Sequence, residues 1–174
     1  NDTNSTNNST TKPTLCTMTD GNHGRAVAKC ATEQGCESVI YVPHDMKQAR
    51  KDAIEKEGGR VIVVDGSYDD AIEIVKSEAD TNGWKLVCDT AWPGYTDVPL
   101  DIIAGYTTLF REIDEQWNDK SNENITHVIL QAGVGGFAAA GVAWIELNKN
   151  ESNTSWCKNI KIIIVEPDDA ACLL

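Results

Sequence analysis

The sequence predicts an α/β fold with mostly parallel sheets. Short apolar segments alternate with longer amphipathic ones, which is the pattern of strands joined by helical crossovers. Glycines follow several of the amphipathic segments, as expected where helices end. Two glycine-rich turns, each between an apolar segment and a helix-like one, place candidate functional groups at strand ends.

The first predicted lobe comes after a polar N-terminal segment. Residues 1–13 are almost entirely Asn, Thr, Ser and Asp, and with so little to bury they predict a disordered tail. Residues 14–97 then form a small α/β lobe, whose apolar strands are predicted at 15–18, 39–42, 61–64 and 85–88. Helices with apolar residues at helical spacing are predicted at 23–34, 47–56 and 68–80. Gly35, Gly58 and Gly83 stand where these helices stop.

A second lobe, residues 98–174, is expected beyond a boundary near Asp97 to Pro99. Its predicted elements are a long helix at 100–117, a strand at 126–131, a helix at 135–147 and a strand at 161–165. The helix at 135–147 begins with glycines and alanines, which let it lie near its neighbours. Alternating strands and helices imply right-handed crossovers in both lobes.

Composition excludes several classes of function. With 15 basic and 27 acidic side chains the formal charge is −12, so the chain repels nucleic acid. The longest apolar runs, such as Ile160 to Val165, are far shorter than the roughly 20 residues of a membrane helix. No signal peptide is evident, and we expect a soluble, cytoplasmic protein.

The six cysteines are scattered without close pairs, so we expect no metal site. Cys16 and Cys88 lie in apolar, strand-like segments, where cysteine usually behaves as a small buried hydrophobe. Disulfides are the alternative that we consider less favoured.

The first glycine-rich turn is Thr-Asp-Gly-Asn-His-Gly at residues 19–24. Backbone N–H groups and the helix dipole at such a turn suit an anion. Asp20 is a candidate proton acceptor in this pocket, and it is also a candidate helix cap; the two roles are compatible. The structural alternative is that Gly21 and Gly24 only permit a tight turn.

The second turn, Gly133 to Gly136, follows a strand roughly 110 residues later. It lacks the lysine of a nucleotide P-loop and does not match the dinucleotide pattern, so a phosphate cup fits it better. A glycine-rich helix start that serves packing alone is the alternative.

A third candidate segment, Asp89 to Tyr95, lies between a strand and the long helix, where open α/β folds bind ligands. Asp89 is a candidate site residue or a turn residue, and Trp92 is a candidate packing residue between the lobes. Glu166 and Asp168 follow the last strand and mark another strand end.

These motifs, in this order, resemble the type II fold of pyridoxal-phosphate enzymes, which includes tryptophan synthase β, threonine dehydratase and cysteine synthase. Within it, the resemblance is to the diaminopropionate ammonia-lyase subfamily. It covers residues 14–174 and rests on TDGNHGR, DTAWPGY, LQAGVGG and VEPDDA. Asp20 is the specific point, because most members of the fold carry Ser or Thr there.

The resemblance implies two three-layer α/β/α lobes of the tryptophan synthase β-like fold, with an incomplete large lobe. It implies pyridoxal 5'-phosphate as cofactor and elimination of ammonia from 2,3-diaminopropionate, giving pyruvate and ammonia. By this resemblance Asp20 is the general base and Asp89 an acidic contact to the substrate's amino groups. The same resemblance implies that Asn22 contacts the cofactor ring hydroxyl and that Thr19, Gly21 and His23 adjoin the substrate. It also implies that the phosphate binds at Gly133, Val134, Gly135 and Gly136 and that the full-length protein is a homodimer.

One departure from the family concerns lysine. The family's Schiff-base lysine lies well upstream of the asparagine turn, and here only Lys12 precedes that turn. The segment that contacts the pyridine nitrogen would follow Leu174. We therefore expect no covalent attachment of the cofactor and an inactive chain, either a fragment or a truncated relative. A serine or threonine dehydratase, or a non-catalytic binding protein with this fold, are the alternatives.

Overall fold

The computed structural model describes residues 12–19, 21–66, 68–117, 125–150 and 156–173. The chain divides into two compact units, Asn1–Cys88 and Asp89–Leu174. The predicted boundary near Asp97 falls in the first turn of a helix of the second unit. Across the described ranges, none of the helices has both the length and the apolar character that a membrane crossing requires.

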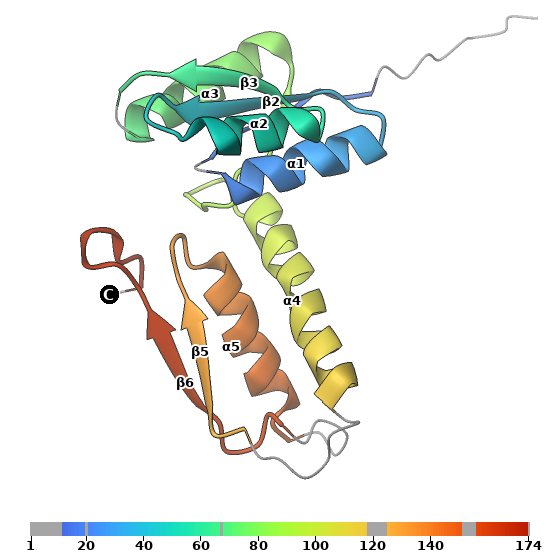
Figure 1. Ribbon diagram of the computed structural model, residues 1–174, viewed down its shortest axis with the longest axis vertical. Helices are drawn as coiled ribbons and strands as arrows, with labels where there is room; N and C mark the ends of the chain where they lie inside the picture. Colours follow the sequence, from blue (N-terminus) through green and yellow to red (C-terminus); the bar gives the residue numbers. More distant parts are fainter. Residues whose placement is uncertain (1–11, 20, 67, 118–124, 151–155, 174) are drawn as a thin grey trace, which may run out of the picture. The chain divides into compact units, whose positions relative to one another are not determined.

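The first unit is built on a four-stranded parallel sheet with the order β3-β2-β1-β4 (Figure 1). Its strands are β1 (Leu15–Met18), β2 (Ser38–Pro43), β3 (Arg60–Val64) and β4 (Lys85–Leu86). Its helices are α1 (Asn22–Glu33), α2 (Gln48–Lys56) and α3 (Tyr68–Asn82). The predicted strands and helices of this lobe are therefore confirmed, with small shifts at their ends.

Helices cover both faces of this sheet, because side chains of successive strand residues point to opposite faces. One face packs against α3 through Cys16, Met18, Val39, Tyr41, Ala71, Val75 and Ala79. The other face packs against α1 and α2 through Val27, Ala28, Ile40, Val42 and Ile54. This confirms the three-layer architecture predicted for the first lobe.

Strand β4 is shorter than the predicted strand at 85–88. The N–H of Val87 still donates to the carbonyl of Cys16 at 2.8 Å, but the carbonyl of Val87 accepts from His23 Nε2 at 2.8 Å. A side chain of α1 thus takes the acceptor that a continuing strand would offer, and the ladder stops.

The second unit holds a parallel pair of strands, β5 (His127–Gln131) and β6 (Lys161–Val165), with His127 opposite Lys161. Its helices are α4 (Asp97–Trp117) and α5 (Gly136–Asn148), and a short 3₁₀ helix spans Asp168–Ala170 (Figure 1). Helix α4 begins before the predicted residue 100 because Pro99 lies in its first turn, where a missing N–H costs nothing.

The core of the second unit lies between the two strands and the helices α4 and α5. Its buried members include Phe110, Leu130, Ala138 and Ile145, with Ile162 and Ile164 packed against them. The described residues form two layers here, a sheet and its helices.

None of the six cysteines, all of which lie in the described ranges, forms a disulfide. Cys16 and Cys88 are buried, as predicted for small hydrophobes. Burial raises the pKa of Cys16 to about 12 and that of Cys157 to about 11, so both thiols stay protonated at neutral pH.

Close packing of α5 on α4 gives a test of this core. A Cβ at Gly141 would lie 2.7 Å from both Leu130 Cδ1 and Phe110 Cζ, whereas one at Gly105 of α4 meets nothing within 4 Å. We expect Gly141→Ala to lower the free energy of unfolding by about 1–3 kcal/mol and Gly105→Ala to raise it by about 0.5–1 kcal/mol. Denaturant unfolding measures both, and a stabilising Gly141→Ala would contradict this packing.

Candidate functional site

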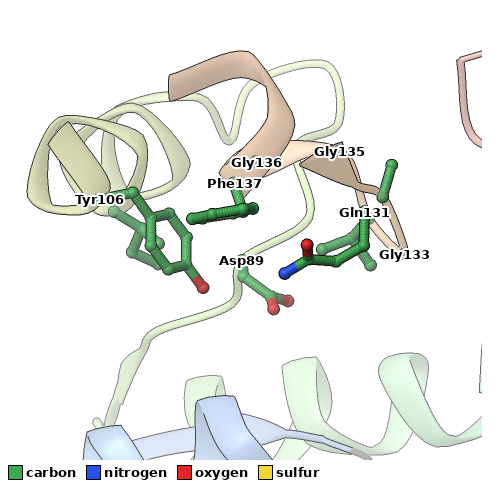
Figure 2. Close-up of a pocket in the computed structure, with 10 residues that line it drawn as sticks. Asp89, Tyr106, Gln131, Gly133, Gly135, Gly136 and Phe137 are labelled. Atoms are coloured by element: carbon green, nitrogen blue, oxygen red, sulfur yellow. The ribbon is translucent and has the colours of Figure 1, made fainter. Parts of the chain in front are cut away.

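A cavity of about 180 Å³ lies in the second unit, at the ends of β5 and the start of α5 (Figure 2). Its wall includes the whole turn from Gly133 to Gly136, together with Asp89, Tyr106, Gln131 and Phe137. The structure therefore brings together two groups that the sequence placed in separate motifs, the predicted phosphate turn and Asp89.

The turn has the features of an anion cradle. Gly135 is the N-cap of α5, with φ +81°, a left-handed conformation that favours glycine. Among the described residues no side chain caps α5, and the first turn of this helix contains no acidic residue. The first N–H groups of a helix have no helical acceptor, so those of Gly136 and Phe137 are available to an anion.

Gly133 leaves space at this cradle. A Cβ built there meets no atom within 4 Å, and the φ of this residue is not in the left-handed region. A side chain at Gly133 would therefore meet open space and would not strain the backbone. This open approach fits the close contact that a phosphate makes with backbone N–H groups.

Aromatic packing holds the start of α5 in place. Phe137 stacks on Phe110 with ring centroids 5.5 Å apart and meets the ring of Tyr106 edge-on at 5.6 Å. On the other side, the N–H of Ala132 donates to the carbonyl of Val165 at 2.9 Å, which ties the residue before the turn to β6. The turn is thus fixed from α4 and from the sheet.

Asp89 faces two neutral polar groups. The hydroxyl of Tyr106 and the side-chain amide of Gln131 point toward its carboxylate from opposite sides (Figure 2). Burial raises the pKa of Tyr106, and the negative charge of Asp89 raises it further, so this hydroxyl remains protonated and able to donate at neutral pH.

Sequence reasoning assigned no role to Tyr106 or Gln131. Gln131 ends β5, and its place at the carboxyl end of a parallel strand is a signal that could have marked it. Tyr106 lies within an amphipathic helix, where nothing in the sequence distinguishes it from a packing residue.

The segment after β6 lies against the turn. Glu166 accepts hydrogen bonds from the N–H groups of Cys172 and Leu173 at 2.8 and 3.0 Å and from the Cys172 thiol at 3.1 Å. These hydrogen bonds hold the pKa of Glu166 below its ordinary value, and the bond from the Cys172 thiol has the largest effect. A Cβ at Gly135 would lie 3.4 Å from Cys172 Sγ, so this segment flanks the turn.

Residues Trp92 to Tyr95 form a tight turn. The backbones of Trp92 and Tyr95 exchange hydrogen bonds at 3.2 and 2.9 Å, and their rings stack at 4.2 Å. Gly94 has φ +87°, the left-handed conformation that the third residue of a type II turn adopts, with Pro93 before it. The ring of Trp92 therefore packs locally; its predicted role between the lobes stays a prediction.

In the first unit, Thr19 shapes the turn that starts α1. Its Oγ1 accepts hydrogen bonds from the N–H groups of Gly21 and Gly24, at 3.0 and 3.1 Å, and its side chain is buried. A Cβ at Gly24 would lie 2.2 Å from Thr19 Cγ2, so only glycine fits there. Asp20, the predicted base, lies outside the described residues.

The other predicted residues of this turn lie at the N-terminal end of α1. Asn22 is exposed at the first position of the helix. Gly21 lies against Arg50 of α2, whose Cδ is 3.4 Å from a Cβ built on that glycine. His23 donates from Nε2 to the carbonyl of Val87, so it fastens α1 to the chain beyond β4. The predicted substrate contacts of Gly21 and His23 stay predictions.

Lys12 lies at the other end of α1. Its ammonium group donates to the carbonyl of Gln34, the residue that follows the 12-residue helix. At 1.5 Å per residue this end is about 18 Å from the start of α1. Lys12 thus supports the C-terminal end of the helix dipole and does not approach the Thr19 turn.

Within the described ranges, no three His, Cys, Asp or Glu side chains cluster as metal ligands.

Comparison with known proteins relates this geometry to one family. Residues 4–174 match the family described as "Pyridoxal-phosphate dependent enzyme". Diaminopropionate ammonia-lyase of Escherichia coli (strain K12) is 43% identical over 162 residues, which are 93% of this chain and 39% of that protein. The chloroplastic threonine dehydratase 1 of Solanum lycopersicum is 30% identical over 93% of this chain and 23% of its own length.

A solved structure shows the same relation. The holo diaminopropionate ammonia-lyase of Escherichia coli superposes with a TM-score of 0.83 at 44% identity, covering 93% of this chain and 40% of that one. The present chain therefore spans about two fifths of the length of the ammonia-lyase it matches.

The Thr19 turn yields a prediction. Thr19→Val keeps the side-chain shape but removes the acceptor of two N–H groups, one of them buried, so we expect a loss of about 1–2 kcal/mol in the free energy of unfolding. Thr19→Ser keeps the oxygen and should lose less. Denaturant unfolding compares the two, and equal losses would show that the methyl group matters more than the hydrogen bonds.

Proposed function

The chain belongs to the pyridoxal-phosphate-dependent enzymes, and we propose that the complete protein removes ammonia from 2,3-diaminopropionate to give pyruvate and ammonia. The observation that carries this proposal is the cavity in which a glycine turn suited to phosphate and the Asp89 carboxylate share one wall. A carboxylate beside the cofactor site suits a substrate that carries two amino groups. Similarity to the ammonia-lyase over 93% of the chain supports the same choice.

The residues present fit the cofactor at its phosphate. The turn from Gly133 to Gly136 would hold the phosphate through backbone N–H groups at the start of α5, with Val134 in the same turn. Asn22 would contact the ring hydroxyl. When bound, pyridoxal phosphate withdraws electrons from the Cα of an amino acid and so makes its proton removable.

The chain's own acidic residues would then divide the work. We propose that Asp20 takes the proton from Cα and that Asp89 holds the substrate's amino groups. We also propose that Thr19, Gly21 and His23 border the substrate. The hydrogen bonds of Thr19 and His23 support a second role, in which these two residues keep the start of α1 in place.

Lys12 is tied to Gln34, so we infer that it does not bind the cofactor and that these 174 residues by themselves are inactive. The family resemblance favours a homodimer in the cytoplasm for the complete protein, acting on a small amino acid. A serine or threonine dehydratase is the second candidate, supported by the 30% identity to threonine dehydratase. Ammonia release from diaminopropionate, compared with turnover of serine and threonine, decides between the two.

Gly133 offers a test of the phosphate turn. Gly133→Val places a branched side chain in the cradle without a backbone clash, so pyridoxal phosphate should bind the complete protein at least about tenfold more weakly, while thermal unfolding of the apoprotein changes little. Gly135→Val is a poorer probe, because φ +81° strains any side chain there. The matched control is Gly105→Val, outside the cavity. Equal cofactor affinity in the wild type, Gly133→Val and Gly105→Val would reject the Gly133 to Gly136 turn as the phosphate site.

Asp20 offers a test of the base. A single carboxylate reaches the Cα proton from one face of the substrate, so Asp20→Asn should slow one diaminopropionate enantiomer by about 10² to 10⁴ and the other much less. Pyruvate release from each enantiomer by the complete protein measures this. Asp52→Asn, at an exposed residue of α2, is the control. Wild-type rates with both enantiomers would leave Asp20 as a helix cap only.

A further inference from the structure

The ten residues that line the cavity carry a single formal charge, the carboxylate of Asp89. Two neutral groups point toward it: the Tyr106 hydroxyl, from α4, and the Gln131 amide, from the end of β5 (Figure 2). Neutral polar groups of this kind can orient a carboxylate without adding an opposite charge of their own.

Packing places Tyr106, and strand pairing places the backbone of Gln131. The ring of Tyr106 meets Phe137 edge-on at 5.6 Å, and its Cε2 is 3.9 Å from a Cβ built on Gly136, so this ring packs against the start of α5. Gln131 is the last residue of β5, opposite Val165 of β6, and its side chain is exposed. A donor on a packed ring loses little entropy on binding, which makes the Tyr106 hydroxyl effective in orienting a charge.

We propose that Tyr106 and Gln131 are positioning residues, which hold Asp89 toward the amino group that leaves the substrate and so favour a diamino acid over a hydroxy amino acid. This inference rests on the proposed function. An ammonium group donates three hydrogen bonds and attracts an oriented carboxylate, whereas the hydroxyl of serine is neutral and gains much less from it. If Asp89 loses this orientation, binding of the diamino acid should weaken more than binding of serine.

The test uses the complete protein loaded with pyridoxal phosphate and the variant Tyr106→Phe, which removes one oxygen and keeps the ring packing. Dissociation constants for 2,3-diaminopropionate and serine come from titration of the cofactor absorbance, and kcat/KM for each comes from pyruvate release. We expect diaminopropionate to lose about tenfold in both quantities, the size of one lost polar interaction with a charged group, and serine to change less than about twofold. Tyr41→Phe, at a buried tyrosine of the first unit, should leave both substrates unchanged.

Gln131→Met, similar in volume but without the amide, is the second variant and should shift selectivity in the same direction. It also keeps the test decisive if Tyr106→Phe lowers the thermal unfolding temperature. Equal losses for the two substrates, or unchanged selectivity in both variants, would overturn the positioning role. The proposed function is tested separately, on the wild-type protein alone. A wild type that binds the cofactor but releases no ammonia from diaminopropionate would reject it.

Discussion

The first turn of a helix carries backbone N–H groups that find no acceptor among the helix's own carbonyls, and α1 and α5, which both follow strands, meet this constraint differently. At α1 part of the need is met within the protein, because Thr19 Oγ1 accepts from the N–H groups of Gly21 and Gly24. At α5 none of the described side chains caps the helix. The turn before α1 is therefore shaped by the side chain of Thr19, which accepts hydrogen bonds from backbone N–H groups. The turn before α5 leaves its N–H groups to an external anion.

Close packing then decides how accurately the open start is placed. Gly141 lets α5 approach Phe110, and Phe110 in turn supports Phe137 at the edge of the cavity. The chain from the core to the cradle is therefore a series of direct contacts between aromatic rings and small residues. Interiors packed in this way have little freedom to relax, so the geometry of the cradle depends on residues that never contact a ligand.

Periodicity and glycine positions were enough to predict the order of strands and helices, since both signals are local in the chain. The stop of β4 was not predictable, because it depends on His23, a residue 64 positions away from Val87. Likewise the glycine turn and Asp89 were each identified as site candidates, but Tyr106 was not. Its contact with the site depends on how α4 packs, and one tyrosine in an amphipathic helix gives no sign of that.

The outward face of β5 and β6 has a consequence for handling the protein. Ile129, Ile163 and Val165 on this face are 65%, 43% and 51% exposed, and the first two are direct partners across the strands. Parallel sheets normally have both faces covered, so this surface has the composition of an interior. We expect a purified sample of this 174-residue chain to self-associate through the exposed face of β5 and β6. The apolar face would then control the solubility of the chain despite the repulsion expected from a net charge of −12.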